Sequence, residues 1–239
     1  MRMQLLPGLY QISGSLSGLS GSQVEKPFSV CNSYTLKVGS DIILVDCGTD
    51  ASWPETERIM QMWGLDSSKI CALLLTHAHY DHAQASHLLK EKGVPIYAHQ
   101  QTALAIASGD HRCCGYLYHA EFSPVTADVI LQDQQSITIS GLSIQALHLP
   151  GHTLGCTSYL VDWEGKKILF TGDVIGTLGY GHFGWDGSID FDKKLYLKSL
   201  LRLVDIPFDV MLPGHGLCSF HNPKQRVEVS LNEALMQWR

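Results

Sequence analysis

An apolar run over residues 70–75 is followed at once by a cluster of metal-ligand side chains. A continuous apolar run of this length is typical of a β-strand buried on both faces. The six residues that follow Thr76 include three histidines and an aspartate: His77, His79, Asp81 and His82. His77 and His79 point the same way on an extended chain, because side chains alternate with a period of two. We therefore predict that these two histidines share one metal ion, and that Asp81 and His82 reach a second ion.

Three later apolar runs each lead to a glycine that is followed directly by another ligand-type residue. These residues are His152 after Gly151, Asp173 after Gly172, and His215 after Gly214. Glycine lets the backbone turn tightly and approach an ion. Loops at strand ends are also the usual place for a functional site on a rigid scaffold. Each segment alone is equally well read as a simple turn, but together they predict one site with six or seven nitrogen and oxygen ligands. Imidazole and carboxylate groups suit zinc, and also iron or manganese.

The rest of the chain alternates paired strands with helices, without an internal repeat or a long linker. We predict strands over residues 9–13, 33–38, 41–45, 70–75, 95–98, 136–139, 142–147, 157–162, 167–171 and 209–212. We predict helices over residues 52–63, 83–92, 192–204 and 223–238, the first with Ser52 as its N-cap and Gly64 just past its end. Residues 100–135 are interpreted as helices of an insertion. Mixed strands and helices indicate the α/β class, and the length favours a single domain over residues 1–239.

Composition restricts the surroundings and partners of the chain. Hydrophobic residues make up 45% and charged residues 17%, which excludes a disordered chain. The net charge of −6 argues against a nucleic-acid partner. Pro7 and Gly8 break the N-terminal apolar stretch, so neither an export signal nor a membrane span is expected. Seven scattered cysteines without a Cys-x-x-Cys motif predict a cytoplasmic protein. We expect a small-molecule substrate and no membrane partner, and the sequence leaves the oligomeric state open.

Taken in order, the motifs resemble those of the metallo-β-lactamase fold superfamily. The residues that carry the resemblance are His77-x-His79-x-Asp81-His82, His152 in Pro-Gly-His-Thr, Asp173 in Thr-Gly-Asp, His215 in Pro-Gly-His-Gly, and Asp46 in Asp-Cys-Gly. They span most of the chain. The resemblance implies a four-layer αβ/βα sandwich of two mixed β-sheets flanked by helices, with the metals at one edge.

The resemblance also implies a role for each ligand in a site for two divalent ions, with Zn²⁺ expected first and iron or manganese as alternatives. The first ion would be bound by His77, His79 and His152, the second by Asp81, His82 and His215, with Asp173 bridging both. Asp46 would lie outside the ligands and hold one histidine in the right tautomer.

Such a centre implies a metal-dependent hydrolase in which a bridging hydroxide attacks the carbonyl of a small ester, thioester or lactone. Asp81 is a candidate proton shuttle to the leaving group. Other interpretations remain open: an iron-dependent oxidoreductase resembling the sulfur dioxygenases of this superfamily, a phosphodiesterase, or a metal-stabilised module without catalysis.

A glycine-rich segment after Asp173 is a candidate wall of the substrate pocket. Its aromatic and histidine side chains are Tyr180, His182, Phe183 and Trp185. Apolar side chains with a few polar groups are typical of small-molecule sites. Four histidines outside the motifs are assigned to structure rather than to the site: His87, His99, His148 and His221. Tyr116 and Tyr118 are expected on the ordinary surface.

Overall fold

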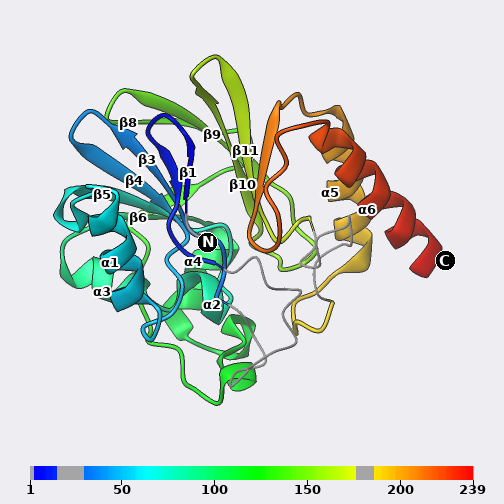
Figure 1. Ribbon diagram of the computed structural model, residues 1–239. Coiled ribbons are helices and arrows are strands. Elements are labelled where there is room, and N and C mark those ends of the chain that lie inside the picture. The colour runs from blue at the N-terminus through cyan, green and yellow to red at the C-terminus, as the bar shows by residue number, and fades with distance from the viewer. Residues whose placement is uncertain (1–2, 15–29, 176–185, 239) are drawn as a thin grey trace, which may run out of the picture.

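The computed structural model describes residues 3–14, 30–175 and 186–238, and over these residues two β-sheets lie between two groups of helices (Figure 1). The first sheet has seven strands in chain order: β1 Met3–Leu6, β2 Leu9–Gln11, β3 Tyr34–Val38, β4 Asp41–Val45, β5 Ile70–Leu74, β6 Ile96–His99 and β7 Val129–Leu131. Strands β1 to β4 pair antiparallel, whereas β4 to β7 pair parallel. This sheet is therefore mixed.

The second sheet has five strands, again mixed. Its spatial order is β12 Val210–Pro213, β11 Lys166–Gly172, β10 Thr157–Trp163, β9 Leu142–His148 and β8 Ser136–Ile139. Only β11 and β12 pair parallel; the other neighbours are antiparallel. Parallel pairs place their carboxyl ends at the same edge of a sheet, so β4 with β5, and β11 with β12, each deliver two loops to one edge.

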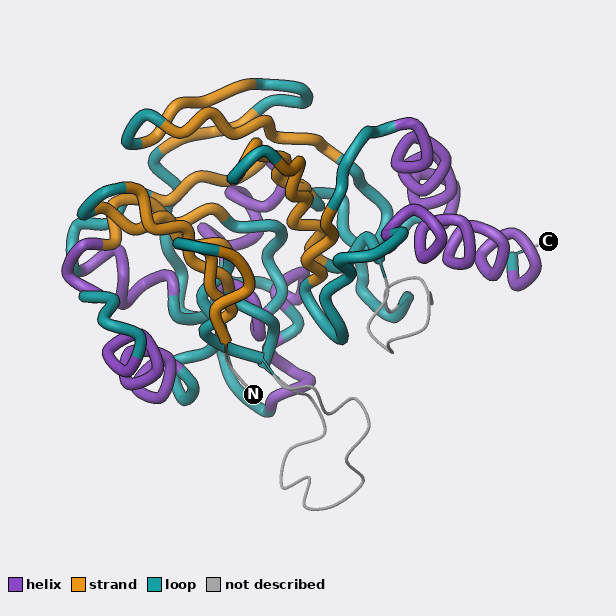
Figure 2. The backbone as a smooth tube through the Cα atoms, turned by 45° about the horizontal axis from the view of Figure 1, so that its top comes forward, coloured by secondary structure: helices purple, strands orange, loops and turns teal. Residues whose placement is uncertain are grey.

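Helices cover the outer side of each sheet, as the tube view in Figure 2 also shows. Those near the first sheet are α1 Trp53–Met62, α2 Tyr80–Ala83, α3 Ser86–Glu91 and α4 Gln100–Ser108. Those on the second sheet are α5 Lys193–Asp205 and α6 Pro223–Gln237. Three short 3-10 turns are η1 Ser67–Lys69, η2 His111–Cys113 and η3 Gly115–Tyr118.

Three separate apolar cores lie between the four layers. Ile42 and Leu44 belong to the core between the first sheet and its helices, whereas Ile43 and Val45 belong to the core between the two sheets. This alternation follows from the strand period of two. A third core, which includes Leu200 of α5, joins the second sheet to α5 and α6. The predicted four-layer αβ/βα sandwich is confirmed.

Two predicted local features are wrong, each for a visible reason. The helix predicted over residues 83–92 begins earlier, at Tyr80, and is interrupted before Ser86. The break arises because the Ala85 amide donates to the carbonyl of Gly48, 3.0 Å away, instead of continuing the helix. Ser52 precedes α1 but does not cap it, because its hydroxyl exchanges hydrogen bonds of 2.9 Å with the backbone of Thr49.

Two edge strands escape the sequence pattern altogether. The predicted strands include neither β1, which has four residues, nor β7, which has three, although the equally short β2 is predicted. Residues 100–135 do contain the expected helical turns, but they also supply β7, which closes the first sheet beside β6.

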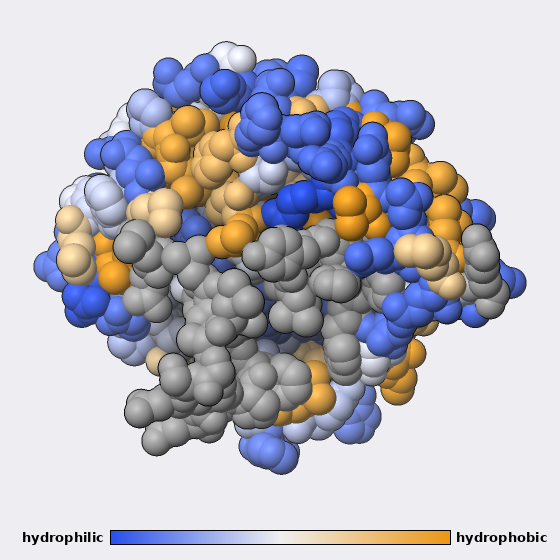
Figure 3. Space-filling view, turned by 45° about the vertical axis from the view of Figure 1, so that its right-hand side comes forward, coloured by the Kyte–Doolittle hydropathy of each residue, from blue (hydrophilic) through white to orange (hydrophobic). Residues whose placement is uncertain are grey.

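The surface mixes hydrophilic and hydrophobic side chains on the face seen in Figure 3. Among the exposed large apolar residues are Leu201 on α5 and Leu235 and Met236 on α6. Single exposed apolar residues are normal for a folded protein. Across the described ranges, no helix combines the length and the apolar character that crossing a bilayer requires.

Two histidines assigned to structure stack where the sheets approach each other. The rings of His99, at the end of β6, and His148, at the end of β9, lie 3.7 Å apart with an interplanar angle of 14°. Burial, with help from His148, lowers the pKa of His99 from 6.5 to about 4, against a smaller opposing effect of Asp133. The folded protein therefore holds His99 neutral where the unfolded chain takes up a proton.

We expect the lowered pKa of His99 in this pair to make the free energy of unfolding depend on pH. The unfolded state binds more protons between the two pKa values, so the free energy of unfolding should fall as the pH decreases from 6.5 to about 4. His99 is the N-cap of α4 and its side chain accepts from the Gln101 amide at 3.3 Å. Asn can cap a helix in the same way, so His99→Asn should keep the cap and reduce this slope by up to one proton. Denaturant titrations at several pH values measure it, and equal slopes for both proteins would contradict the interpretation.

Candidate metal centre

Five strand ends place the candidate ligands and Asp46 at one edge of the sandwich. Asp46 follows β4, His77 follows β5, and His152 follows β9. Asp173 directly follows β11, and His215 lies two residues after β12. The two sheets face each other at this edge, so ligands from both halves of the chain come into contact.

Three histidines form the first group. His77, His79 and His152 are buried, and each offers a ring nitrogen within 4.8 Å of the others. His152 Nε2 lies 3.1 Å from His79 Nδ1, and the rings of His77 and His79 lie edge to face at 4.6 Å. The structure thus brings together the residues predicted to bind the first ion.

A second group forms beside the first where α2 begins. Its members are Asp81, His82 and His215, whose ligand atoms also lie within 4.8 Å of one another. His215 Nε2 lies 2.9 Å from Asp81 Oδ2 and 3.1 Å from His82 Nε2. Because α2 starts at Tyr80, its first turn directs Asp81 and His82 toward the loop that carries His215.

Asp173 lies between the two groups. Its Oδ1 is 3.4 Å from His82 Nε2, while its Oδ2 is 3.5 Å from His152 Nε2 and 3.6 Å from His215 Nε2. One carboxylate therefore faces nitrogens of both groups, the arrangement that a bridging ligand requires.

The electrostatics favour the metal-binding forms of His77, His79 and Asp173. Burial, together with the neighbouring histidines, lowers the pKa of His77 and of His79 well below the usual value. Burial opposes ionisation of Asp173, but His215 and His82 outweigh it and hold the pKa of this carboxyl well below its usual range. Neutral imidazole and ionised carboxylate are the forms that bind metals. Burial opposes protonation of His82 and His215, but neighbouring acidic groups outweigh it and raise the pKa of both, so these two rings lose a proton when a metal binds.

One buried nitrogen of the cluster has no hydrogen-bond partner and so tests whether a metal ion fits there. His77 Nε2 is buried and has no hydrogen-bond partner, although leaving a buried polar atom unpaired costs about 1–3 kcal/mol. This nitrogen belongs to the three-histidine group. An ion there would satisfy it, so the donor set fits divalent metals that accept nitrogen and oxygen ligands.

Asp46 connects the two groups from behind. Its Oδ2 lies 2.8 Å from His82 Nδ1 and accepts from the Thr76 hydroxyl at 2.7 Å, while its Oδ1 accepts from the Thr76 amide at 2.8 Å. Thr76 Oγ1 in turn lies 3.0 Å from His77 Nδ1. A carboxylate only accepts, so His82 Nδ1 and the Thr76 hydroxyl both donate to Asp46. Since the hydroxyl has a single proton, Thr76 Oγ1 accepts from His77 Nδ1. In the neutral ring, the form that binds a metal, both imidazoles thereby present Nε2 to the cluster as the lone pair.

Glycines next to the ligands are required by close approach. A Cβ on Gly214 would lie 2.2 Å from Asp173 Oδ1, and one on Gly151 would lie 2.2 Å from the backbone of Tyr196. Gly172 has a φ of +53° and lies against Thr76. The expected role of glycine beside each ligand is thus supported by the contacts.

Several residues near the cluster escape sequence reasoning. Tyr118 stacks on Tyr80 at 4.8 Å, beside Asp81, instead of lying on the ordinary surface. Cys31 lies within 4.8 Å of ligand atoms of Asp46 and His82, but burial raises the pKa of its thiol.

The predicted pocket wall lies outside the described residues. This concerns all four of its members, Tyr180, His182, Phe183 and Trp185.

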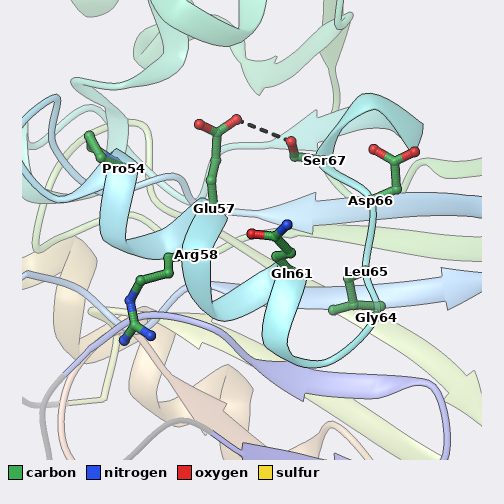
Figure 4. Close-up of a pocket in the computed structure, with 8 residues that line it drawn as sticks. All are labelled: Pro54, Glu57, Arg58, Gln61, Gly64, Leu65, Asp66 and Ser67. Atoms are coloured by element: carbon green, nitrogen blue, oxygen red, sulfur yellow. Dashed lines mark hydrogen bonds between the residues drawn. The ribbon is translucent and has the colours of Figure 1, made fainter.

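A separate cavity of about 640 Å³ lies against α1, lined by Pro54, Glu57, Arg58, Gln61, Gly64, Leu65, Asp66 and Ser67 (Figure 4). Glu57 there binds Ser67 at 3.1 Å and Lys92 at 2.7 Å, and Arg58 pairs with Glu55. Its charges are satisfied within the protein, and its lining includes none of the candidate ligands.

Comparison with known families agrees with the geometry. The model of the metallo-beta-lactamase superfamily matches residues 27–215. The match covers most of the chain and includes every candidate ligand. The protein therefore belongs to this superfamily.

Individual relatives share 30% sequence identity or less with this chain in the two examples that follow. The chain is 27% identical to an atrochrysone carboxyl ACP thioesterase of Aspergillus fumigatus over 217 residues, which cover 90% of this chain and 59% of that protein. It is 30% identical to a probable metallo-hydrolase of Bacillus subtilis over 148 residues, 61% of this chain and 68% of that one. The chain thus spans about three fifths of the fungal relative.

Solved structures support the same fold. A metallo-beta-lactamase of Cronobacter sakazakii superposes with a TM-score of 0.78 at 22% identity, covering 100% of this chain and 97% of that one. A second, from Elizabethkingia meningoseptica, gives 0.77 at 21% identity over 99% and 90% of the two chains. At such identities the likeness concerns the fold alone.

We expect Gly214→Ala to disrupt the centre without unfolding the protein. The new methyl group would displace Asp173 or His82, since its Cβ would also lie 2.7 Å from His82 Cε1. Overpacking of this kind costs about 1–3 kcal/mol, and metal affinity should fall by at least roughly tenfold. Metal titration with a competing chelator measures the change.

Gly141→Ala is the matched control, because it introduces a methyl group into open space at a glycine with a positive φ of +85°. It should lose some stability and keep its metal. Wild-type affinity in Gly214→Ala would argue against the close approach.

Proposed function

We propose that this protein is a dinuclear zinc-dependent hydrolase that cleaves the acyl C–O or C–S bond of a small ester, thioester or lactone. The observation that carries the proposal is Asp173, whose two oxygens face the nitrogens of His82 on one side and His152 on the other. When bound, two divalent ions would supply a nucleophile near neutral pH and a Lewis acid for the carbonyl oxygen.

The chain itself contributes binding, orientation and proton transfer. His77, His79 and His152 would hold one ion, and Asp81, His82 and His215 the other. Asp81 is only 8% exposed and lies 2.9 Å from His215 Nε2. Burial opposes its ionisation, but His82 and His215 lower its pKa, so Asp81 enters the reaction as a carboxylate. A carboxylate at this position can accept a proton and pass it to a leaving group.

The substrate class is supported by chemistry and by one relative. The fungal relative is named a thioesterase, and a thioester carbonyl is among the groups that such a centre can attack. We propose a small organic molecule as the partner of the site. The metal could also be iron or manganese, since the same nitrogen and oxygen ligands suit them.

We expect the protein, purified without chelators, to contain two divalent ions per chain and to be colourless. Chelation should abolish hydrolysis, and added Zn²⁺ should restore it. A panel of thioesters, lactones, esters and phosphodiesters then identifies the bond. Strong visible absorption from iron together with oxygen consumption would support an oxidoreductase instead, and turnover of phosphodiesters alone would favour a phosphodiesterase.

We expect Asp173→Asn to retain the fold and to lose one ion, because the amide preserves the shape but removes the shared charge. Turnover should fall by roughly two orders of magnitude or more, since a bound metal supplies several kcal/mol of transition-state stabilisation. Metal analysis and steady-state kinetics measure both effects. Asp162→Asn is the control, because the Asp162 side chain is 77% exposed on β10. Full turnover in Asp173→Asn would refute the bridging role.

A further inference from the structure

A short segment before α5 reaches back to the first histidine group. Ser188, which is 8% exposed, places its hydroxyl 3.3 Å from His79 Nε2. The same hydroxyl donates to Asp190 Oδ1 at 2.6 Å. Neither Ser188 nor Asp190 belongs to any of the metal motifs in the sequence. Their contact with His79 joins residues that lie 109 positions apart.

The direction of these hydrogen bonds follows from counting protons. An ionised carboxylate only accepts, so the single hydroxyl proton of Ser188 goes to Asp190. Ser188 then has lone pairs left with which to accept from His79, and His79 Nε2 must carry the proton. The neutral ring is the form that binds a metal, and it has one N–H. Its Nδ1 is therefore a lone pair, on the side where His152 Nε2 lies 3.1 Å away.

His79 is oriented opposite to two of its neighbours. His77 and His82 contact Thr76 and Asp46 through Nδ1 and leave Nε2 facing the cluster. The Asp46 network is therefore suited to produce one tautomer, and His79 requires the other. A separate acceptor on the far side of the His79 ring meets this requirement.

The same segment also supports the loop that carries His152. Asp190 Oδ2 accepts from the Leu154 amide at 3.1 Å, and the Asp192 amide donates to the Gly151 carbonyl at 2.9 Å. Asp192 further caps α5 by accepting from the Lys194 amide at 2.8 Å. Asp190 thus contacts both a ligand-bearing loop and, through Ser188, a ligand ring.

We propose that Ser188 and Asp190 are positioning residues that hold His79 as its Nε2–H tautomer and so direct Nδ1 to the first metal site. This inference rests on the proposed function for its metal, but the tautomer is a property of the protein without metal. Residues that hydrogen-bond to a metal-binding histidine in this way typically contribute roughly 10- to 100-fold to metal affinity.

The test compares Ser188→Ala with Ser188→Thr in the full chain. Long-range ¹H–¹⁵N NMR spectra of the metal-free protein assign the tautomer of His79 directly. Wild type should show Nε2–H, Ser188→Ala a mixture or the opposite form, and Ser188→Thr the wild-type form, because threonine keeps the hydroxyl. In competition with a chelator, one of two Zn²⁺ equivalents should bind roughly 10- to 100-fold more weakly to Ser188→Ala.

Ser158→Ala is the matched control. It removes a buried hydroxyl whose hydrogen bond goes to the Thr171 carbonyl, at 3.2 Å, and not to an imidazole. It should leave the tautomer and both affinities unchanged. An unchanged His79 tautomer in Ser188→Ala, or equal losses of affinity in both alanine variants, would overturn the inference. If the tautomer and the affinity change as expected while wild type hydrolyses no carbonyl substrate, the proposed function fails and the positioning role stands.

Discussion

The rest of the site depends on the hydrogen bonds that the buried carboxylate of Asp46 accepts. It is 1% exposed, yet it accepts hydrogen bonds from the Thr76 amide and hydroxyl and from His82 Nδ1. Charge-assisted bonds of this kind compensate the loss of water around a buried ion. Since Thr76 also contacts His77, one charge orients a ligand in each group. The strained backbone of Asp46, with a φ of 53°, is tolerated because these contacts over-determine it.

The sandwich makes this interaction possible by aligning strand ends. Val45 pairs with Leu74 across the parallel strands β4 and β5, so the residues just beyond them, Asp46 and Thr76, become neighbours. On the opposite sheet Phe170 pairs with Leu212, which brings the loops after β11 and β12 together in the same way. The apolar core between the sheets sets how closely these two pairs of loops approach. Ligands from distant parts of the chain thus meet with little freedom of their own.

Close backbone approach is the other requirement of the centre. Gly214 leaves no room for a Cβ beside Asp173, and Gly151 lies against the backbone of Tyr196. The glycines are therefore part of the metal-binding arrangement as much as the histidines are. They explain why the ligands follow glycine in three separate strand-end segments.

Much of the fold and the candidate ligands could be predicted from local patterns. The apolar run before His77 is a buried strand with Leu73 facing one core and Leu74 the other, as a period of two requires. The break in the helix before Ser86 could not be predicted, because its cause is a hydrogen bond to Gly48, far away in the chain. Strands β1 and β7, at the two edges of the first sheet, are also missing from the prediction.

The sequence by itself determined which residue types stand at the strand ends, in what order, and with glycine beside them. Only the tertiary structure decided which ring nitrogen each histidine presents. Ring orientation depends on hydrogen-bond partners behind the ligand, such as Asp46 behind His82 and Ser188 behind His79. These partners come from distant segments and carry no local periodic signal. A sequence pattern specifies the backbone around a histidine ligand, whereas the packing of remote segments specifies the tautomer and the orientation of its ring.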